Sequence, residues 1–333
     1  MRRPGRVVLR VLAGVAVAAV ATGAGGGPAH ASPGPTAPSV KCPSPRSAAH
    51  VATAGQLARA LTAAHAGSTI LLADGVYAGH FVTRARGTAK RPVTICGTSG
   101  TVLSGGSDRA GTVLLLKNAP YTHVTGLTVS NGSKGIVVDH SSHAVLTAVT
   151  VHMTGQEGIH IQRFSVGAVV RDSAVYDTGR RIARFGEGVY IGTAKANWCL
   201  VTGCRPDGSN GALVERTTIG PSVRAEAIDV KEGTRGGRLS HNTFDGVGMT
   251  AARSWVDVKG NGWTIADNAG RSTPDYGFTD SRPAAGWGND NLFTRNTAYV
   301  PRSSAGFHVD PGTRGVRLDD NKVVVTAPGL SLF

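Results

Sequence analysis

The sequence predicts an all-β fold, a right-handed parallel β-helix (a solenoid) with an N-terminal capping helix. From about residue 111 onward, short segments rich in Val, Ile and Thr alternate with clusters of Gly, Asn, Asp and Ser. That composition is typical of strands and of the turns between them. The same pair of strands and turns recurs along the chain. The spacing between successive copies varies, as expected if loops are inserted at one place in the repeat. Such a pattern is typical of a solenoid.

One series of segments should stack strand on strand. It reads "GIVVDH" (135–140), "GIHIQR" (158–163), "GVYIGT" (188–193), "AIDVKE" (227–232), "WVDVKG" (255–260), "GFTDSR" (277–282) and "GFHVDP" (306–311). The segments between them include "HNTF", "DNAG", "RNTA" and "DNKV", which resemble the Asn-rich turns of parallel β-helices. A β-propeller is the competing architecture, but its blades need four strands in every ~40–45 residues, and that period does not fit.

The N-terminus has the features of an export signal. Four arginines precede an apolar run, and "AHA" at 29–31 offers the small residues that a signal peptidase requires (Arg2, Arg3, Arg6 and Arg10). A membrane anchor is the alternative, but the run is short and Gly-rich, and no other segment approaches the ~20 apolar residues of a span. We therefore expect a secreted (extracellular) protein without a membrane span after cleavage. The predicted parts are a signal peptide at 1–31, a flexible leader at 32–41 and a single β-helix domain at 42–333.

A short amphipathic helix is predicted ahead of the first strands, in "TAGQLARALTAAHAG". Its apolar positions have the three-to-four-residue spacing of one helix face (Leu57, Ala60, Leu61 and Ala64). A solenoid needs a cap over its first coil, because an open core end would aggregate. We interpret the helix as that cap.

Four cysteines in an exported chain suggest disulfides. Cys199 and Cys204 are close in sequence and would close one loop. Cys42 and Cys96 would then pair and attach the N-terminal strand to the body. Four cysteines allow three pairings, so the connectivity stays open at this point.

The formal net charge is +14, which favours polyanionic partners. Aromatic residues are few and no Lys/Arg run or binding motif is present, so we expect no nucleic acid. An acidic polysaccharide suits an exported protein better, and we expect the protein to act as a monomer. The net charge alone does not exclude the alternative that the basic composition only keeps the protein soluble.

Stacking places aligned residues about 4.8 Å apart. The inward positions are apolar, except that Asp280 interrupts the second inward column and predicts a register slip or the start of a loop. The outward columns read Val137, His160, Tyr190, Asp229, Asp257, Thr279, His308 and Asp139, Gln162, Gly192, Lys231, Lys259, Ser281, Asp310. Three successive strands are preceded by Glu157, Glu187 and Glu226. We expect the inserted loops 163–187 and 193–213 to enclose this face as a groove.

The outward residues suit β-elimination of a uronate. The substrate carboxylate must be neutralised before its α-proton can be removed, by a hard cation or by clustered Arg and Lys. A Lys can then serve as base where its surroundings lower its pKa. Lys231 and Lys259 are the candidate bases, and clustered carboxylates suit Ca²⁺, with Glu226, Glu187 and Asp229 as its ligands. The expected substrate-binding residues are Asp257, Tyr190, His160, His308 and Trp255, with Arg253 and Arg282 at strand edges for uronate carboxylates.

Two stretches carry a family resemblance. "LARALTAAHAGSTILLADGVYAG…RPVTICG" and "AEAIDVKEGTRGGRLSHNTFDG" resemble the alginate lyase and chondroitinase B family of polysaccharide lyases, which are pectate-lyase-like parallel β-helices. The resemblance implies that Lys231 is the Brønsted base and that Glu226, five residues before it, binds Ca²⁺. It implies an acid about twenty residues downstream, where Arg253 and Lys259 are the nearest counterparts. A second acidic ligand of the family is replaced here by Arg224, which would hold the substrate carboxylate.

Two further function classes stay open at the level of sequence. A glycoside hydrolase on the same fold could use Asp229, Asp257 and Glu226, and the separation of its carboxylates would decide the stereochemical outcome. A non-catalytic glycan-binding or cell-surface protein is the other. Opposite charges on adjacent strands stabilise a sheet by up to ~1 kcal/mol without any function, so paired lysines are compatible with it.

Overall fold

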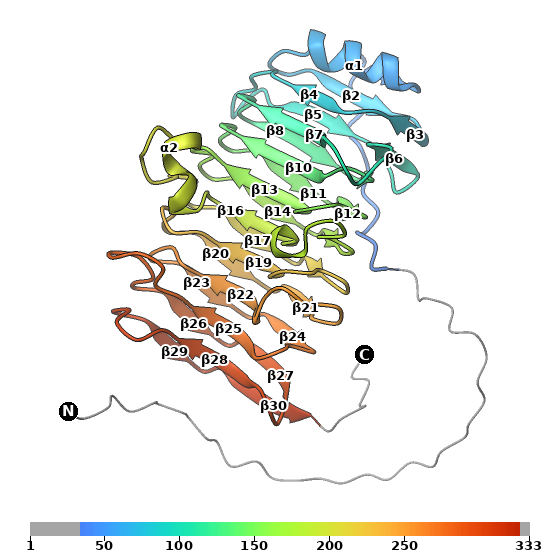
Figure 1. Cartoon of the computed structure of the whole chain (residues 1–333). Helices are drawn as coiled ribbons and strands as arrows, with labels where there is room; N and C mark the ends of the chain where they lie inside the picture. The colour runs from blue at the N-terminus through green and yellow to red at the C-terminus, as the bar shows by residue number, and fades with distance from the viewer. Residues whose placement is uncertain (1–33, 327–333) are drawn as a thin grey trace, which may run out of the picture. The chain divides into compact units, whose positions relative to one another are not determined.

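The computed structural model describes residues 34–326 as three parallel sheets that wind together into one solenoid, the predicted right-handed parallel β-helix. Figure 1 shows the coils stacked from α1 at one end to β30 at the other. Each strand pairs in register with its counterpart one coil away. The predicted export signal lies outside the described residues, and the predicted domain boundaries stay predictions.

An eleven-stranded sheet forms one face of the described solenoid. Its strands, in order, are β1 (Ala49–Val51), β2 (Thr69–Leu72), β5 (Val93–Cys96), β8 (Thr122–Thr125), β11 (Val145–Thr147), β14 (Val169–Arg171), β17 (Leu213–Glu215), β20 (Arg238–Ser240), β23 (Thr264–Ala266), β26 (Leu292–Thr294) and β29 (Arg317–Asp319). A ten-stranded sheet contains β3 (Gly75–Ala78), β6 (Thr101–Ser104), β9 (Thr128–Ser130), β12 (Thr150–His152), β15 (Ala174–Val175), β18 (Thr218–Ile219), β21 (Thr243–Asp245), β24 (Ala269–Arg271), β27 (Thr297–Pro301) and β30 (Lys322–Thr326).

The nine-stranded sheet contains the stacked series that the sequence predicts. Its strands are β4 (Phe81–Thr83), β7 (Thr112–Lys117), β10 (Lys134–Asp139), β13 (Ile159–Gln162), β16 (Val189–Ile191), β19 (Ile228–Val230), β22 (Ser254–Val258), β25 (Tyr276–Asp280) and β28 (Ala305–Val309). The predicted inward columns form the core, since Ile136, Ile159, Val189, Ile228, Val256 and Phe278 are all fully buried.

Asp280 does not mark a register slip, so that alternative is wrong, but it does mark the start of a loop, because β25 ends at this residue and β26 begins only at Leu292. The residue stays in register between Val258 and Val309 and is fully buried. The side-chain amide of Asn291 donates a hydrogen bond to its Oδ2 at 2.7 Å, which satisfies one oxygen of this inward carboxyl. Burial raises the pKa of Asp280 to about 7 despite that hydrogen bond. A polar core position therefore replaces the expected slip in register.

Helix α1 (Ala54–Ala63) packs on the first strands, as expected of the capping helix. Thr53 caps its N-terminus by accepting a hydrogen bond from the Gln56 amide at 3.2 Å. Leu57 and Leu61 are buried against the core. The remaining helical segments are short: η1 (Ala183–Phe185), η2 (Lys195–Asn197) and α2 (Trp198–Val201).

The Asn-rich turns form a ladder of side-chain amides inside the described coils. Asn242, Asn268, Asn296 and Asn321 occupy equivalent positions in successive coils. The Oδ1 of Asn242 accepts the backbone N–H of Thr217, and the Oδ1 of each later Asn accepts the backbone N–H of the preceding Asn. Each Nδ2 donates to a backbone carbonyl of a neighbouring coil. The amides satisfy buried backbone groups that a tight turn would otherwise leave unpaired.

Both expected disulfides are present, Cys42–Cys96 and Cys199–Cys204. The first attaches the segment before β1 to β5, and residues 34–41 also contact the body, where the Ala37 amide donates to Thr150 Oγ1 at 3.1 Å. The second closes the α2 loop. Among the described helices, none is long and apolar enough to cross a membrane.

Candidate active site

The outward face of the nine-stranded sheet gathers the predicted site residues in register. Tyr190 lies beside Asp229, Asp229 beside Asp257, Asp257 beside Thr279, and Thr279 beside His308 on consecutive strands. The sequence alignment of the coils is therefore confirmed for this column. Since paired positions in a sheet lie about 4.8 Å apart, each of these side chains can contact the next.

Asp229 lies between two lysines. Its Oδ2 pairs with Lys231 Nζ at 2.6 Å, and its Oδ1 pairs with Lys259 Nζ at 2.6 Å. Lys259 also pairs with Asp257 Oδ2 at 2.7 Å. The Asp229 side chain is almost fully buried at 2% exposure, so both ion pairs are largely shielded from water. The tripeptide Asp-Val-Lys occurs at 229–231 and again at 257–259, and three of its four charged side chains are thus in contact at the Asp229 carboxylate.

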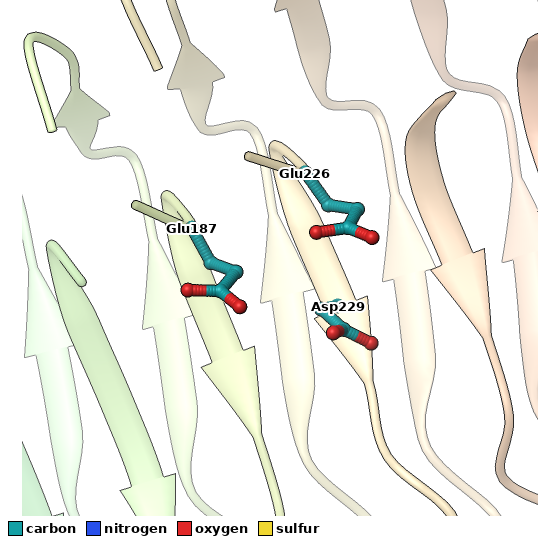
Figure 2. A group of neighbouring side chains, drawn as sticks. All are labelled: Glu187, Glu226 and Asp229. Carbon is teal, nitrogen blue, oxygen red and sulfur yellow. The ribbon is translucent and has the colours of Figure 1, made fainter. Parts of the chain in front are cut away.

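Two glutamates stand at the start of the adjacent strands. Figure 2 shows Glu187 before β16 and Glu226 before β19, with their carboxyl groups directed toward the same space as Asp229. Oxygen atoms of the three groups lie within 4.8 Å of one another. Glu187 is buried, and its Oε2 has no hydrogen-bond partner among the described residues.

Because the three acids are buried close together, Glu187, Glu226 and Asp229 differ in pKa. Burial, together with Asp229 and Glu226, raises the pKa of Glu187 to about 9. Burial and Asp229 raise the pKa of Glu226 to about 7. Burial also acts to raise the pKa of Asp229, but Lys259 and Lys231 outweigh it and hold that pKa below its usual value. Glu187 is therefore a neutral acid at pH 7, whereas Asp229 is a carboxylate.

Lys259 is a poor base. Burial alone would lower its pKa, but Asp229, Asp257 and Glu226 outweigh that effect and hold it well above its usual value. Lys259 therefore remains an ammonium, and the expectation that it removes a proton is not supported. Its contacts suit it to hold Asp229 and Asp257 in place.

Tyr190 faces the site beside Lys231. The Lys231 Nζ lies 5.1 Å from the centre of the Tyr190 ring, which is a cation–π distance. Burial, with Asp229 and Glu187, raises the pKa of Tyr190, so its hydroxyl stays protonated. The Tyr190 hydroxyl therefore keeps its proton beside the Lys231 side chain.

His160 supports Tyr190 instead of facing the groove, which corrects its assignment as a substrate-binding residue. Its side chain is buried, its Nε2 lies 3.0 Å from the Gly192 carbonyl, and the Tyr190 ring packs on it edge to face at 4.5 Å. Burial and the nearby Lys134 lower the pKa of His160 to about 4, so the imidazole is neutral at pH 7. The loop after β16 covers it.

Trp255 does not stack on a sugar, so that prediction is also wrong. The indole is fully buried, its Nε1 donates to the Arg271 carbonyl at 2.9 Å, and its ring packs against Phe278. Gly270 and Gly277 make the space, because a Cβ at either position would lie within 2.7 Å of the indole. Alternation along β22 predicts Trp255 on the same face as Asp257, but its indole packs inward against Phe278.

The two inserted loops differ from expectation in extent. The stretch 163–187 contains the regular strands β14 and β15, so only the part after β15 is an insertion, and it leads into Glu187. The loop 193–212 is a real insertion before β17 and contains η2 and α2. Asp207 fixes it, accepting hydrogen bonds from the amides of Arg163 and Phe164 and from the Thr193 hydroxyl.

Glu232, which no sequence pattern indicated, connects this loop to the segment that carries Lys231. It directly follows Lys231, is buried, and accepts the Lys195 amide at 2.6 Å. Glu232 belongs to the segment "DVKEG", which the alignment of the coils contains. No pattern in the sequence indicates that its partner is the backbone amide of Lys195, in the loop before β17. Asp207 lies outside the repeat and left no pattern either.

A pocket adjoins the cluster on the side of the C-terminal coils. Glu226, Asp257 and Arg253 line it together with Tyr276, Thr279 and His308. Arg253 pairs with Asp275 at 2.7 Å and lies at the edge of the site, while Arg224 donates to the Gly248 carbonyl at 3.1 Å. Arg282 donates from Nη1 to the Gly312 carbonyl at 2.9 Å. The sequence columns already contained Thr279 and His308, whereas Tyr276 was missed because it precedes the aligned part of its strand.

The acidic cluster fits Ca²⁺ only in part. Ca²⁺ takes six to eight oxygen ligands. Glu187 and Glu226 could each offer a carboxylate, but both oxygens of Asp229 are taken by ammonium groups at 2.6 Å. Those two positive charges also oppose a cation beside Asp229. The donor set is therefore too small for the predicted site, and we derive no step through Ca²⁺.

One sheet face of this parallel β-helix therefore carries amines, carboxyls and a phenol together. The chain is similar to the crystal structure of an alginate lyase from Paenibacillus sp. str. FPU-7, at 33% identity over 83% of this chain and 99% of that one, with a TM-score of 0.72. It therefore belongs to the alginate lyase family of polysaccharide lyases.

Two more distant structures share the fold. Pectate lyase Pel9A matches with a TM-score of 0.60 at 16% identity, over 82% of this chain and 75% of that one. The PL6 family alginate lyase AlyGC matches with a TM-score of 0.51 at 18% identity, over 79% of this chain and 40% of that one. No protein-family model and no curated protein matches the chain.

Replacing Asp229 by Asn should lower the free energy of unfolding by about 3 kcal/mol, because two buried ammonium groups lose their shared counter-ion. Chemical denaturation measures the change. Asp267→Asn is the matched control, since Asp267 also lies near two cations, Arg295 at 2.7 Å and Arg238 at 3.8 Å, but on an exposed face. We expect the control to cost less than about 1 kcal/mol. Equal small losses would contradict the buried double ion pair.

Proposed function

We propose that the protein is a secreted lyase that cleaves a uronate-containing polysaccharide by β-elimination, with Lys231 as the base and alginate as the first substrate to test. The observation that carries this proposal is Asp229 held between Lys231 and Lys259, with Glu187, Glu226 and Tyr190 around it. The relative at 33% identity, an alginate lyase, supports the choice of substrate. Two disulfides support an oxidising, extracellular location.

Lys231 and Lys259 share Asp229 but differ in what they can do. Lys259 has two acidic partners, Asp229 and Asp257, whereas Lys231 has one. When Lys231 gives up its proton, Asp229 keeps the Lys259 ammonium as its counter-ion. Lys231 can therefore alternate between ammonium and amine without leaving a buried carboxylate unpaired.

In the proposed reaction, the Lys231 amine takes the proton from the carbon α to the uronate carboxylate. The electron pair of that C–H bond forms a carbon–carbon double bond, and the glycosidic C–O bond breaks. The Tyr190 hydroxyl gives its proton to the departing oxygen, and the Lys231 ammonium returns a proton to the phenolate. One proton is moved and no water is consumed, so the enzyme ends in its starting state.

Glu187 is proposed to neutralise the substrate carboxylate. A protonated carboxyl donates a hydrogen bond, and burial among acids keeps Glu187 protonated up to a pKa of about 9. Such a bond stabilises the charge that develops on the carboxylate as its α-proton leaves. Arg224, two residues before Glu226 in the sequence, is proposed to add positive charge at the same carboxylate.

Lys231→Ala should abolish formation of unsaturated product, measured by ultraviolet absorbance on alginate, pectate, chondroitin and glucuronan. Tyr190→Phe should lower kcat about 100-fold or more, because the leaving oxygen loses its proton donor. Lys195→Ala is the matched control, since this exposed lysine contacts the site only through its backbone amide. An unchanged rate in Lys231→Ala would exclude Lys231 as the base.

Glu187→Gln should retain activity within a few-fold, because the amide also donates a hydrogen bond, whereas Glu187→Ala should lose it. In the parent the donor is present below a pKa of about 9 and is lost as the pH rises above it, so activity should fall there. The Gln variant should lack this alkaline decline, which a pH–rate profile measures.

The same variant separates this role from a Ca²⁺ ligand. If Glu187 bound Ca²⁺, the Gln variant would bind the ion more weakly, and calorimetric titration of the protein with Ca²⁺ would show it. Tight Ca²⁺ binding by the parent together with inactivity of Glu187→Gln would contradict the neutral-acid role.

A further inference from the structure

The pocket beside the cluster has a polar floor. Asp257, Thr279 and His308 form its central column on β22, β25 and β28, and Ser281 and Asp310 lie two positions further along. The chain from Ala251 to Ser254 forms one side. Glu226 and Asp257 belong to both the pocket and the acidic cluster, so the pocket continues the proposed catalytic groove.

Two floor atoms have no hydrogen-bond partner among residues 34–326. They are Asp257 Oδ1 and Thr279 Oγ1, both buried and on paired positions of adjacent strands. A buried polar atom without a partner is destabilising, so both atoms favour a ligand that supplies hydrogen bonds. A carboxylate oxygen accepts hydrogen bonds, and a threonine hydroxyl both donates and accepts. Neighbouring hydroxyls of a sugar ring match this pair.

An aromatic platform stands at the far side of the pocket. The Tyr276 and His308 rings are stacked, with centroids 4.5 Å apart and planes 17° apart, and both are half-buried. The Arg253 guanidinium lies 4.9 Å from the Tyr276 ring centre and donates to the Tyr276 hydroxyl at 3.1 Å. Arg253 is 70% exposed, and a guanidinium has five N–H donors, more than its contacts to Asp275 and Tyr276 use.

We propose that this pocket is a subsite for one uronate unit. The unit is adjacent to the cleaved bond and lies on the side of that bond that faces the C-terminal coils. Asp257 and Thr279 bind the ring hydroxyls at the floor, and Arg253 binds the unit's carboxylate at the rim. This assignment rests on the proposed function. The orientation follows from charge: Asp257 and Asp310 at the floor would repel a carboxylate, whereas Arg253 attracts one.

The test measures the affinity of an alginate tetrasaccharide, and of its neutral counterpart with reduced carboxyl groups, by calorimetry in a Lys231→Ala background. Adding Arg253→Gln should weaken binding of the acidic ligand about tenfold and leave the neutral one unchanged, since one charge-assisted hydrogen bond is lost. Adding Thr279→Val should weaken both ligands by a similar factor, because the floor contact involves hydroxyls only.

Matched controls exist on the eleven-stranded sheet, away from the pocket. Arg295 pairs with Asp267 at 2.7 Å as Arg253 does with Asp275, and Thr264 is a partly buried strand threonine. Arg295→Gln and Thr264→Val should change neither affinity.

The outcomes separate this subsite from the proposed function. If the Arg253 and Thr279 variants bind both ligands as tightly as the controls while the parent cleaves alginate, the subsite is wrong and the function stands. If Arg253→Gln weakens the neutral ligand as much as the acidic one, the carboxylate assignment is wrong. If the Lys231→Ala protein binds no acidic oligosaccharide and the parent cleaves none, the function and the subsite fail together.

Discussion

The ion pairs of Asp229 with Lys231 and Lys259 are the interaction on which the rest of the site depends. Both distances are 2.6 Å, and the carboxylate is almost fully buried. Removing water from three charges is costly, and the cost is recovered only where the geometry is good. Here the coil register supplies that geometry, because Asp229 stacks directly on Asp257 and brings the second lysine to it. The β-helix therefore sets the chemistry by placing like residues on neighbouring coils.

The same stacking explains how the groups come to differ in protonation. Glu187 and Glu226, at the start of two successive strands, lie close to Asp229, and the two lysines form ion pairs with Asp229 and Asp257 but with neither glutamate. Burial and the neighbouring acids raise the pKa of Glu187 to about 9, and they raise that of Glu226 to about 7 although Lys259 offsets part of the effect. Neighbouring titratable groups whose pKa values differ in this way are typical of sites of acid–base catalysis. One surface thus offers an amine, a phenol and a neutral carboxyl around a fixed carboxylate.

The fold and the column of site residues could be predicted because stacking obeys a local rule: strands pair in register and side chains alternate. The rule placed Asp229 over Asp257 but could not tell that Lys259 would reach across to Asp229, which depends on side-chain conformation. It failed at Trp255, where two glycines in later segments open an inward space. At Asp280 the rule held although the inward residue is an acid, because Asn291 donates a hydrogen bond to that buried carboxyl. Asp207 and Glu232 act on loops outside the repeat, where no periodicity exists.

The central claim is that the chain breaks a uronate polymer by elimination, with no water entering the product. Digestion of alginate in ¹⁸O-labelled water, followed by mass spectrometry of the fragments, tests it most directly. The account predicts that every new non-reducing end is unsaturated, lighter by one water than a hydrolysis fragment, and that no label enters at the cleaved bond. Saturated fragments that carry ¹⁸O would contradict it and would indicate a hydrolase that uses the clustered carboxylates.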